Sequence, residues 1–186
     1  SVLSQTFADF EVIVSDHSSA DGTESIARDY AGRDDRVRVM STPAGGGAVR
    51  NWNAVSTAAT GEYLKLVCGD DLIHPRMLEL QVQALDATPS ASLVASRRRL
   101  IDAHGDEITR ERGLPRMSGR VDGVTAIRAT VLAGANIFGE PACVMVRREI
   151  LADAGWWDST NPYLIDEATY ARVLAHGDLI ALPLVL

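Results

Sequence analysis

The feature that most constrains this chain is the alternation of short apolar segments with longer amphipathic ones. Segments rich in Val, Ile and Leu predict strands, and the segments between them predict helices. Strands are expected at 10–15, 36–40, 62–68, 92–97, 142–147 and 178–182, and helices at 24–30, 48–59, 76–86, 122–132, 148–154 and 166–176. This order indicates a single α/β domain with a mixed, mainly parallel sheet flanked by helices.

Charge and hydropathy exclude several classes of function. The net charge of −7 disfavours general binding to nucleic acid or to an anionic membrane. No apolar run approaches the roughly 18 residues that a membrane-spanning helix needs, and no signal peptide opens the chain. Cys68 and Cys143 fit no metal or disulfide spacing, which is consistent with a reducing compartment. We therefore expect a cytoplasmic protein without a nucleic-acid partner and with at most a peripheral association with the inner face of the membrane.

Two segments in the first half have features of a nucleotide site. Asp16 ends the first predicted strand, and ligands of open α/β sheets bind beyond the carboxyl ends of strands. The same residue could instead cap the following turn. Gly45–Gly47 precede a predicted helix, where glycine backbone and helix dipole favour phosphate, although a glycine-rich loop of this kind is more often purely structural. Arg50 lies in the first turn of that helix, where the dipole disfavours a cation, so it either faces a ligand or points to solvent.

The strongest candidate site is Cys68-Gly-Asp-Asp71, at the end of an apolar predicted strand. Adjacent carboxylates repel each other, and burial increases the cost. A divalent cation such as Mg²⁺ or Mn²⁺ removes both penalties and can bridge a diphosphate. The alternative is a plain turn in which Asp71 caps the helix that follows.

A further carboxylate, Asp166, stands at the start of a predicted helix together with Glu167. A helix N-terminus stabilises the anionic form, which suits either a simple cap or a general base that must be unprotonated. Trp156 precedes this helix and could stack on a sugar ring or pack in the core.

The order of these segments resembles glycosyltransferase family 2, whose members are inverting enzymes of the GT-A fold. The resemblance covers almost the whole chain. It rests on 1–23, on Gly45–Asn51, Ala59–Leu64 and Gly69-Asp-Asp71, and on Asn136–Pro141, Val144–Arg147, Gly155–Asp158 and Asp166–Arg172.

The resemblance implies a metal-dependent transfer of a sugar, of the hexosyltransferase kind, from a nucleotide sugar to a hydroxyl group. The donor is expected to be UDP-linked, and the acceptor a bacterial polysaccharide or glycolipid. Within this scheme Asp70 ligates Mn²⁺ or Mg²⁺ beside Asp71, and Asp166 is the catalytic base. Asp16 and Arg50 are the expected contacts to the nucleotide, and Glu140 and Trp156 are the expected contacts to the acceptor. The resemblance also implies a nucleotide-sugar half, 1–97, and an acceptor half, 98–186.

The sequence departs from the family pattern at three places. His17 and Cys68 stand where the family commonly has aspartates, and the family's first strand is missing before residue 1. Both ends of the chain look cut, because it opens in what reads as the end of a helix and stops just after a predicted strand. These departures leave a non-catalytic GT-A-like partner or scaffold in glycan assembly as the alternative function. A dinucleotide-binding module is disfavoured because no G-x-G-x-x-G follows a strand.

Overall fold

The computed structural model describes residues 1–158 and 160–186. Its strands are β1 (Val12–Asp16), β2 (Val37–Ser41), β3 (Tyr63–Leu64), β4 (Ala91–Ile101), β5 (Glu107–Arg112), β6 (Gly119–Val121), β7 (Val144–Arg147) and β8 (Asp178–Val185). Its α-helices are α1 (Thr23–Ala31), α2 (Gly47–Ala58), α3 (Met77–Asp86), α4 (Gly123–Ala133), α5 (Arg148–Asp153) and α6 (Ile165–Leu174), with 3₁₀ turns η1 (Val2–Ser4) and η2 (Pro141–Cys143). Among the described residues, no helix is long and apolar enough to cross a membrane.

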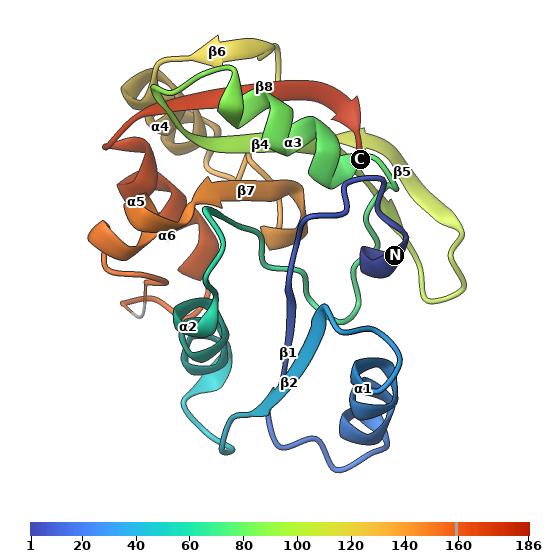
Figure 1. Ribbon diagram of the computed structural model, residues 1–186. Coiled ribbons are helices and arrows are strands. Elements are labelled where there is room, and N and C mark those ends of the chain that lie inside the picture. Colours follow the sequence, from blue (N-terminus) through green and yellow to red (C-terminus); the bar gives the residue numbers. More distant parts are fainter. Residues whose placement is uncertain (159) are drawn as a thin grey trace.

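The strands form two separate sheets. β1 and β2 pair in parallel and, with α1, stand apart from the larger sheet in Figure 1. The larger sheet has the order β3-β7-β4-β8-β6, and β5 pairs with β4 outside this path. In that sheet β4 and β8 pair in parallel. The other pairs, β3 with β7, β7 with β4, β4 with β5, and β8 with β6, are antiparallel.

The predicted mixed α/β class with flanking helices is confirmed, but the predicted mainly parallel pairing is wrong for the described strands. The hydrophobic pattern identifies strands without fixing their direction. A tight connection such as that between β4 and β5 forces antiparallel pairing, and only a crossover such as β1-α1-β2 gives parallel neighbours. The charged segment 98–120, for which a hairpin or a mobile loop was expected, forms the β4–β5 hairpin and leads into β6.

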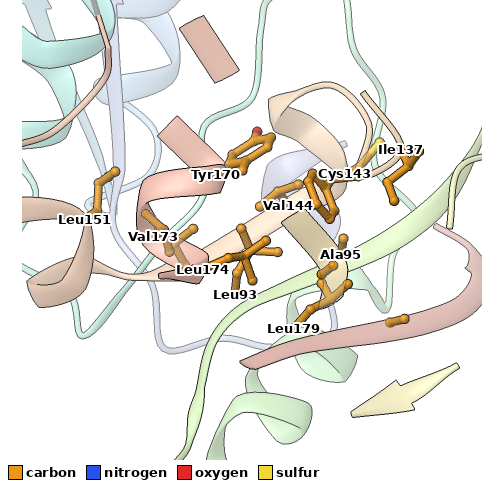
Figure 2. Packing of buried hydrophobic residues seen from close by; sticks show 14 of the residues in the cluster. Leu93, Ala95, Ile137, Cys143, Val144, Leu151, Tyr170, Val173, Leu174 and Leu179 are labelled. Atoms are coloured by element: carbon orange, nitrogen blue, oxygen red, sulfur yellow. The ribbon is translucent and has the colours of Figure 1, made fainter. Parts of the chain in front are cut away.

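The main core lies between the larger sheet and α6. Leu93 of β4 and Leu179 of β8 are fully buried, and they pack with Val173 and Leu174 of α6. Figure 2 shows these side chains with Tyr170, which stands on the same helix one turn earlier. The apolar face of α6 is therefore fixed against the sheet, and this contact sets the position of the helix N-terminus, where Asp166 lies.

Trp157 connects the two halves of the chain through α2. Its backbone N–H donates to Asn53 Oδ1 at 2.9 Å, and its indole N–H donates to Ser56 Oγ at 2.8 Å. The indole also meets Trp52 edge to face, with ring centroids 5.2 Å apart. Because Trp157 is buried, these contacts hold α2 against the segment that precedes α6.

The tight approach of α4 to the end of α6 gives a test of this packing. A Cβ atom on Gly123 would lie 2.1 Å from the carbonyl oxygen of Leu174 and 2.2 Å from that of Gly177. We expect Gly123→Ala to lower the free energy of unfolding by about 3 kcal/mol, because two backbone segments would have to move apart. Gly22→Ala, whose Cβ would meet nothing within 4 Å, should cost less than about 1 kcal/mol. Urea unfolding of both variants measures the difference, and equal costs would contradict this packing.

Candidate active site

One cleft collects residues from both halves of the chain. It has a volume of about 330 Å³. Its walls are formed by Ala48 and Trp52 of α2, by Cys68, Asp70 and Asp71, by Glu140 and Pro141, and by Pro162, Tyr163, Ile165 and Asp166. Four carboxylates from three segments that are distant in sequence therefore line one hollow, which brings the predicted metal ligands and the predicted base together.

The acidic turn is formed by Cys68, Gly69, Asp70 and Asp71, a few residues after β3. The backbone N–H of Asp71 donates to the carbonyl of Cys68 at 3.1 Å, which folds the turn back on itself. One ligand atom from each of Cys68, Asp70 and Asp71 lies within 4.8 Å of the others. Burial raises the pKa of Asp71, and the negative charges of Asp70 and Glu140 raise it further. Burial and the neighbouring carboxylates also raise the pKa of the Cys68 thiol, to about 11.

This donor set fits a divalent cation. The two carboxylates are the oxygen ligands that Mg²⁺ and Mn²⁺ prefer, and a cation would relieve the repulsion that raises the pKa of Asp71. Cys68 offers a softer sulfur where the family commonly has an aspartate oxygen. Asp70 and Asp71 are therefore the residues that would hold the metal.

Asp166 lies across the cleft, in the first turn of α6. Its Oδ1 accepts the backbone N–H of Glu167 at 2.8 Å, and its Oδ2 accepts Asn136 Nδ2 at 2.8 Å. Burial raises the pKa of Asp166, while these hydrogen bonds oppose the rise. The arrangement gives a carboxylate with fixed orientation and raised basicity, which is what a general base requires.

Glu140 is held at the cleft by Arg98. The guanidinium Nη2 of Arg98 donates to Glu140 Oε1 at 3.0 Å, and a second contact runs from Nε to Oε2. The Arg98 side chain is only 13% exposed, whereas that of Glu140 is 49% exposed. Glu140, at the start of η2, therefore presents a carboxylate to the cleft and is anchored there by Arg98 of β4.

Asp16, at the end of β1, and Arg50, in the first turn of α2, do not line this cleft. Asp16 is buried at the end of β1, where its Oδ2 accepts the N–H of Ser19 at 3.0 Å. Its Oδ1 has no hydrogen-bond partner among the described residues, which is costly for a buried carboxylate oxygen. The capping role considered for Asp16 thus accounts for only one of its two carboxylate oxygens.

The glycine-rich loop before α2 is bent by left-handed backbone conformations. Gly45, Gly46 and Gly47 have φ values of 89°, 76° and 65°, a region that side chains disfavour. His17 Nε2 lies 3.1 Å from the carbonyl oxygen of Gly45, so the departure at position 17 contacts this loop. Arg50 is exposed, and its Nη1 lies 3.4 Å from the carbonyl oxygen of Ala44.

The aromatic side chains that line the cleft are not the one that the sequence suggested. Trp156 packs partly buried against the main core and does not line the cleft, whereas Trp52 and Tyr163 do. Tyr163 is 91% exposed, unusual for a large aromatic side chain. Trp52 shares a helix face with Ala48, four residues earlier, and both line the cleft, but nothing in the local sequence singles it out.

Solved structures first identify the fold. The fold resembles that of TarS from S. aureus, residues 1–349, in complex with UDP-GlcNAc, with a TM-score of 0.73, 19% identity, and coverage of 97% of this chain and 50% of that chain. The mannosyltransferase PcManGT from Pyrobaculum calidifontis, in complex with GDP-Man and Mn²⁺, gives a TM-score of 0.68 at 21% identity, with coverage of 98% and 48%. The fold is therefore the GT-A fold of glycosyltransferases.

The sequence then gives the family. The model of glycosyl transferase family 2 matches residues 1–155, so the chain belongs to this family. Chondroitin synthase of Pasteurella multocida is 30% identical over 118 residues, which are 63% of this chain and 12% of the synthase. The chain spans less than two thirds of the length of the curated relatives it matches.

The acidic turn predicts a measurable effect of metal on stability. We expect MnCl₂ at one hundred times its Kd to stabilise the protein by about 2.7 kcal/mol at pH 7.5. The effect should be smaller at pH 5, because the raised pKa of Asp71 leaves more of that carboxyl protonated there. Thermal unfolding with and without Mn²⁺ measures both effects.

The control is a pair of variants. Asp70→Ala with Asp71→Ala should abolish the Mn²⁺ effect, and Asp153→Ala, which removes an exposed carboxylate on α5, should leave it intact. An equal stabilisation in all three proteins would show that the ion binds elsewhere.

Proposed function

We propose that this domain catalyses metal-dependent, inverting transfer of a sugar from a nucleotide sugar, UDP-linked, to a hydroxyl acceptor. The observation that carries the proposal is the meeting of Asp70 and Asp71 with Asp166 across one cleft. Membership of glycosyl transferase family 2 and the GT-A fold support the same chemistry. Mn²⁺ or Mg²⁺ is the proposed cofactor, and Asp70 and Asp71 are its proposed ligands.

In this mechanism Asp166 removes the proton from the attacking hydroxyl group. The hydroxyl oxygen forms its bond to the anomeric carbon as the bond from that carbon to the diphosphate oxygen breaks on the opposite face. The configuration at the anomeric carbon is therefore inverted, the proton ends on Asp166, and the nucleoside diphosphate leaves with the bonding electrons. Each Asp166 oxygen accepts one hydrogen bond from the protein, so lone pairs remain for the incoming proton.

The donor contacts are assigned to the first half of the chain, 1–97. When bound, a divalent cation would neutralise charge on the departing diphosphate. Asp16 would use its unpartnered Oδ1 to accept a base or ribose N–H or O–H. Arg50, exposed beside the glycine-rich loop, would contact the base or diphosphate. The two structural neighbours are in complex with UDP-GlcNAc and with GDP-Man, which supports a nucleotide-sugar donor.

The acceptor is assigned to the second half, 98–186. Glu140 is the proposed acceptor contact because it lies in the same cleft as Asp166. The aromatic contact that the sequence assigned to Trp156 is better met by Tyr163 or Trp52, which line the cleft. A bacterial polysaccharide or glycolipid is the proposed acceptor class, and the likeness to a chondroitin synthase supports it. The reaction would take place in the cytoplasm, at the inner face of the membrane.

The alternative function is a non-catalytic partner or scaffold in glycan assembly. It is suggested by His17 and Cys68, which replace aspartates that are common in the family. A scaffold has no need to gather partly buried and exposed carboxylates whose mutual repulsion opposes folding. The shared cleft of Asp70 and Asp166 therefore favours the transferase.

Calorimetric titration of the full-length protein with UDP and with GDP, each with and without Mn²⁺, tests the proposal. Binding should depend on the metal for one nucleotide, and Asp70→Ala should abolish that dependence. Asp16→Asn should weaken nucleotide binding about tenfold, or about 1.4 kcal/mol, because it removes one charged acceptor. If neither nucleotide binds and other nucleoside diphosphates also fail with Mn²⁺ or Mg²⁺, the transferase proposal is wrong.

The raised pKa of Asp166 predicts the pH dependence of turnover. A base works only when unprotonated, and burial shifts protonation of Asp166 to higher pH than for an ordinary aspartate, whose pKa is about 3.9. We expect kcat at saturating donor and Mn²⁺ to fall about tenfold per pH unit below the raised pKa. Asp166→Asn should remove this limb together with most of the activity. A kcat that stays constant down to pH 4 in the folded protein would exclude Asp166 as the base.

A further inference from the structure

The loop between α4 and η2 brings Asn136 against Asp166, thirty residues away in sequence. Asn136 Nδ2 donates to Asp166 Oδ2 at 2.8 Å and to the carbonyl of Gly139 at 2.9 Å. Its Oδ1 accepts the backbone N–H groups of Phe138 at 3.0 Å and of Gly139 at 3.1 Å. Both N–H groups and both acceptor positions of the amide are therefore used.

This network determines which way the amide faces. If the amide were turned by 180°, its oxygen would face the carbonyl of Gly139 and the carboxylate of Asp166, two acceptors. Its NH₂ group would then face two backbone N–H donors. Asn136 must therefore present an N–H group to Asp166. Its role at this position requires a hydrogen-bond donor and is not met by a side chain of the same size without one.

The loop that carries Asn136 is itself fixed. Thr130, buried on α4, donates to the carbonyl of Ala135 at 2.8 Å and accepts the N–H of Ile137 at 3.4 Å. Gly139 has a φ of 98°, and a Cβ atom there would lie 2.8 Å from Cys143 Sγ, so the loop passes close to η2. These contacts hold Asn136 from both sides, so its amide is a rigid support for the carboxylate.

We propose that Asn136 is a positioning residue for the proposed transfer, orienting the Asp166 carboxylate toward the acceptor hydroxyl. The inference rests on the proposed function. Glu167 N–H holds one oxygen of Asp166 and Asn136 holds the other, so the plane of the carboxylate is fixed by two donors. Without Asn136 the carboxylate could rotate, and one of its oxygens would lose its protein partner.

The kinetic test is Asn136→Asp in the full-length protein. This change keeps the size and the acceptor for Phe138 and Gly139, but it places a second carboxylate against Asp166. We expect kcat for release of UDP from UDP-GlcNAc, or of GDP from GDP-mannose if GDP is the nucleotide that binds, to fall about 100-fold, with the donor KM within about twofold. Asn161→Asp is the matched control, because Asn161 makes a similar turn contact, to the N–H of Tyr163, and does not touch Asp166. Its kcat should stay within about twofold of the unaltered protein.

A stability cycle tests the contact without relying on turnover. At pH 8 we expect Asn136→Asp to lower Tm by about 4 °C, because two carboxylates face each other. The exchanged pair, Asn136→Asp with Asp166→Asn, restores a donor opposite an acceptor and should recover part of that loss. It should recover none of the activity, because the base is gone.

The outcomes separate this inference from the proposed function. A lower kcat at unchanged donor KM, together with recovery of Tm in the exchanged pair, supports the positioning role. An active protein whose Asn136→Asp variant keeps its kcat overturns the inference alone. If the unaltered protein turns over neither donor and binds no nucleotide, the proposed function fails. A Tm recovery in that case would mark the pair as structural and overturn the positioning role too.

Discussion

Repulsion among carboxylates is the constraint on which the site depends. Asp70, Asp71, Glu140 and Asp166 share one cleft, and burial raises the pKa of Asp71 and of Asp166. Such a cluster persists only if other parts of the fold oppose its repulsion. The opposing contributions are apolar burial beneath α6 and hydrogen bonds to individual oxygens. The carboxylates of the site thus lower the stability of the folded protein, and their negative charge is what a cation and a substrate can interact with.

The support beneath the cleft comes from elements that carry no chemistry. α6 lies on the β4–β8 part of the sheet, so the position of Asp166 follows from the packing of Val173 and Leu174 two turns further along. α2 is held by Trp157, which lets Trp52 reach the cleft wall. Substitutions of Val173, Leu174 or Trp157 are therefore expected to displace side chains of the site, although none of these three residues lines the cleft.

The sequence offers candidate residues where function depends on local pattern. Asp70 and Asp71 were identified because paired acids ended an apolar strand, and Asp166 because it opened a helix. Both interpretations left a structural alternative open, and the shared cleft favours the functional one. Asn136 stood inside a motif that resembles the family, yet its contact with Asp166 joins two segments thirty residues apart and has no local signature. The same reason explains why Trp156 was preferred to Trp52, since exposure to a cleft depends on packing.

By itself the sequence determined the kinds of elements and most of their bounds, because hydrophobic period and turn residues act over a few positions. It also determined the residue types available for metal and base chemistry, and its ordered motifs indicated the family. Only the tertiary structure decided the direction of the strands, the split into two sheets and the meeting of distant carboxylates in one cleft. These features depend on which segments pack against one another, and that choice minimises the free energy of the whole chain and not of any one segment.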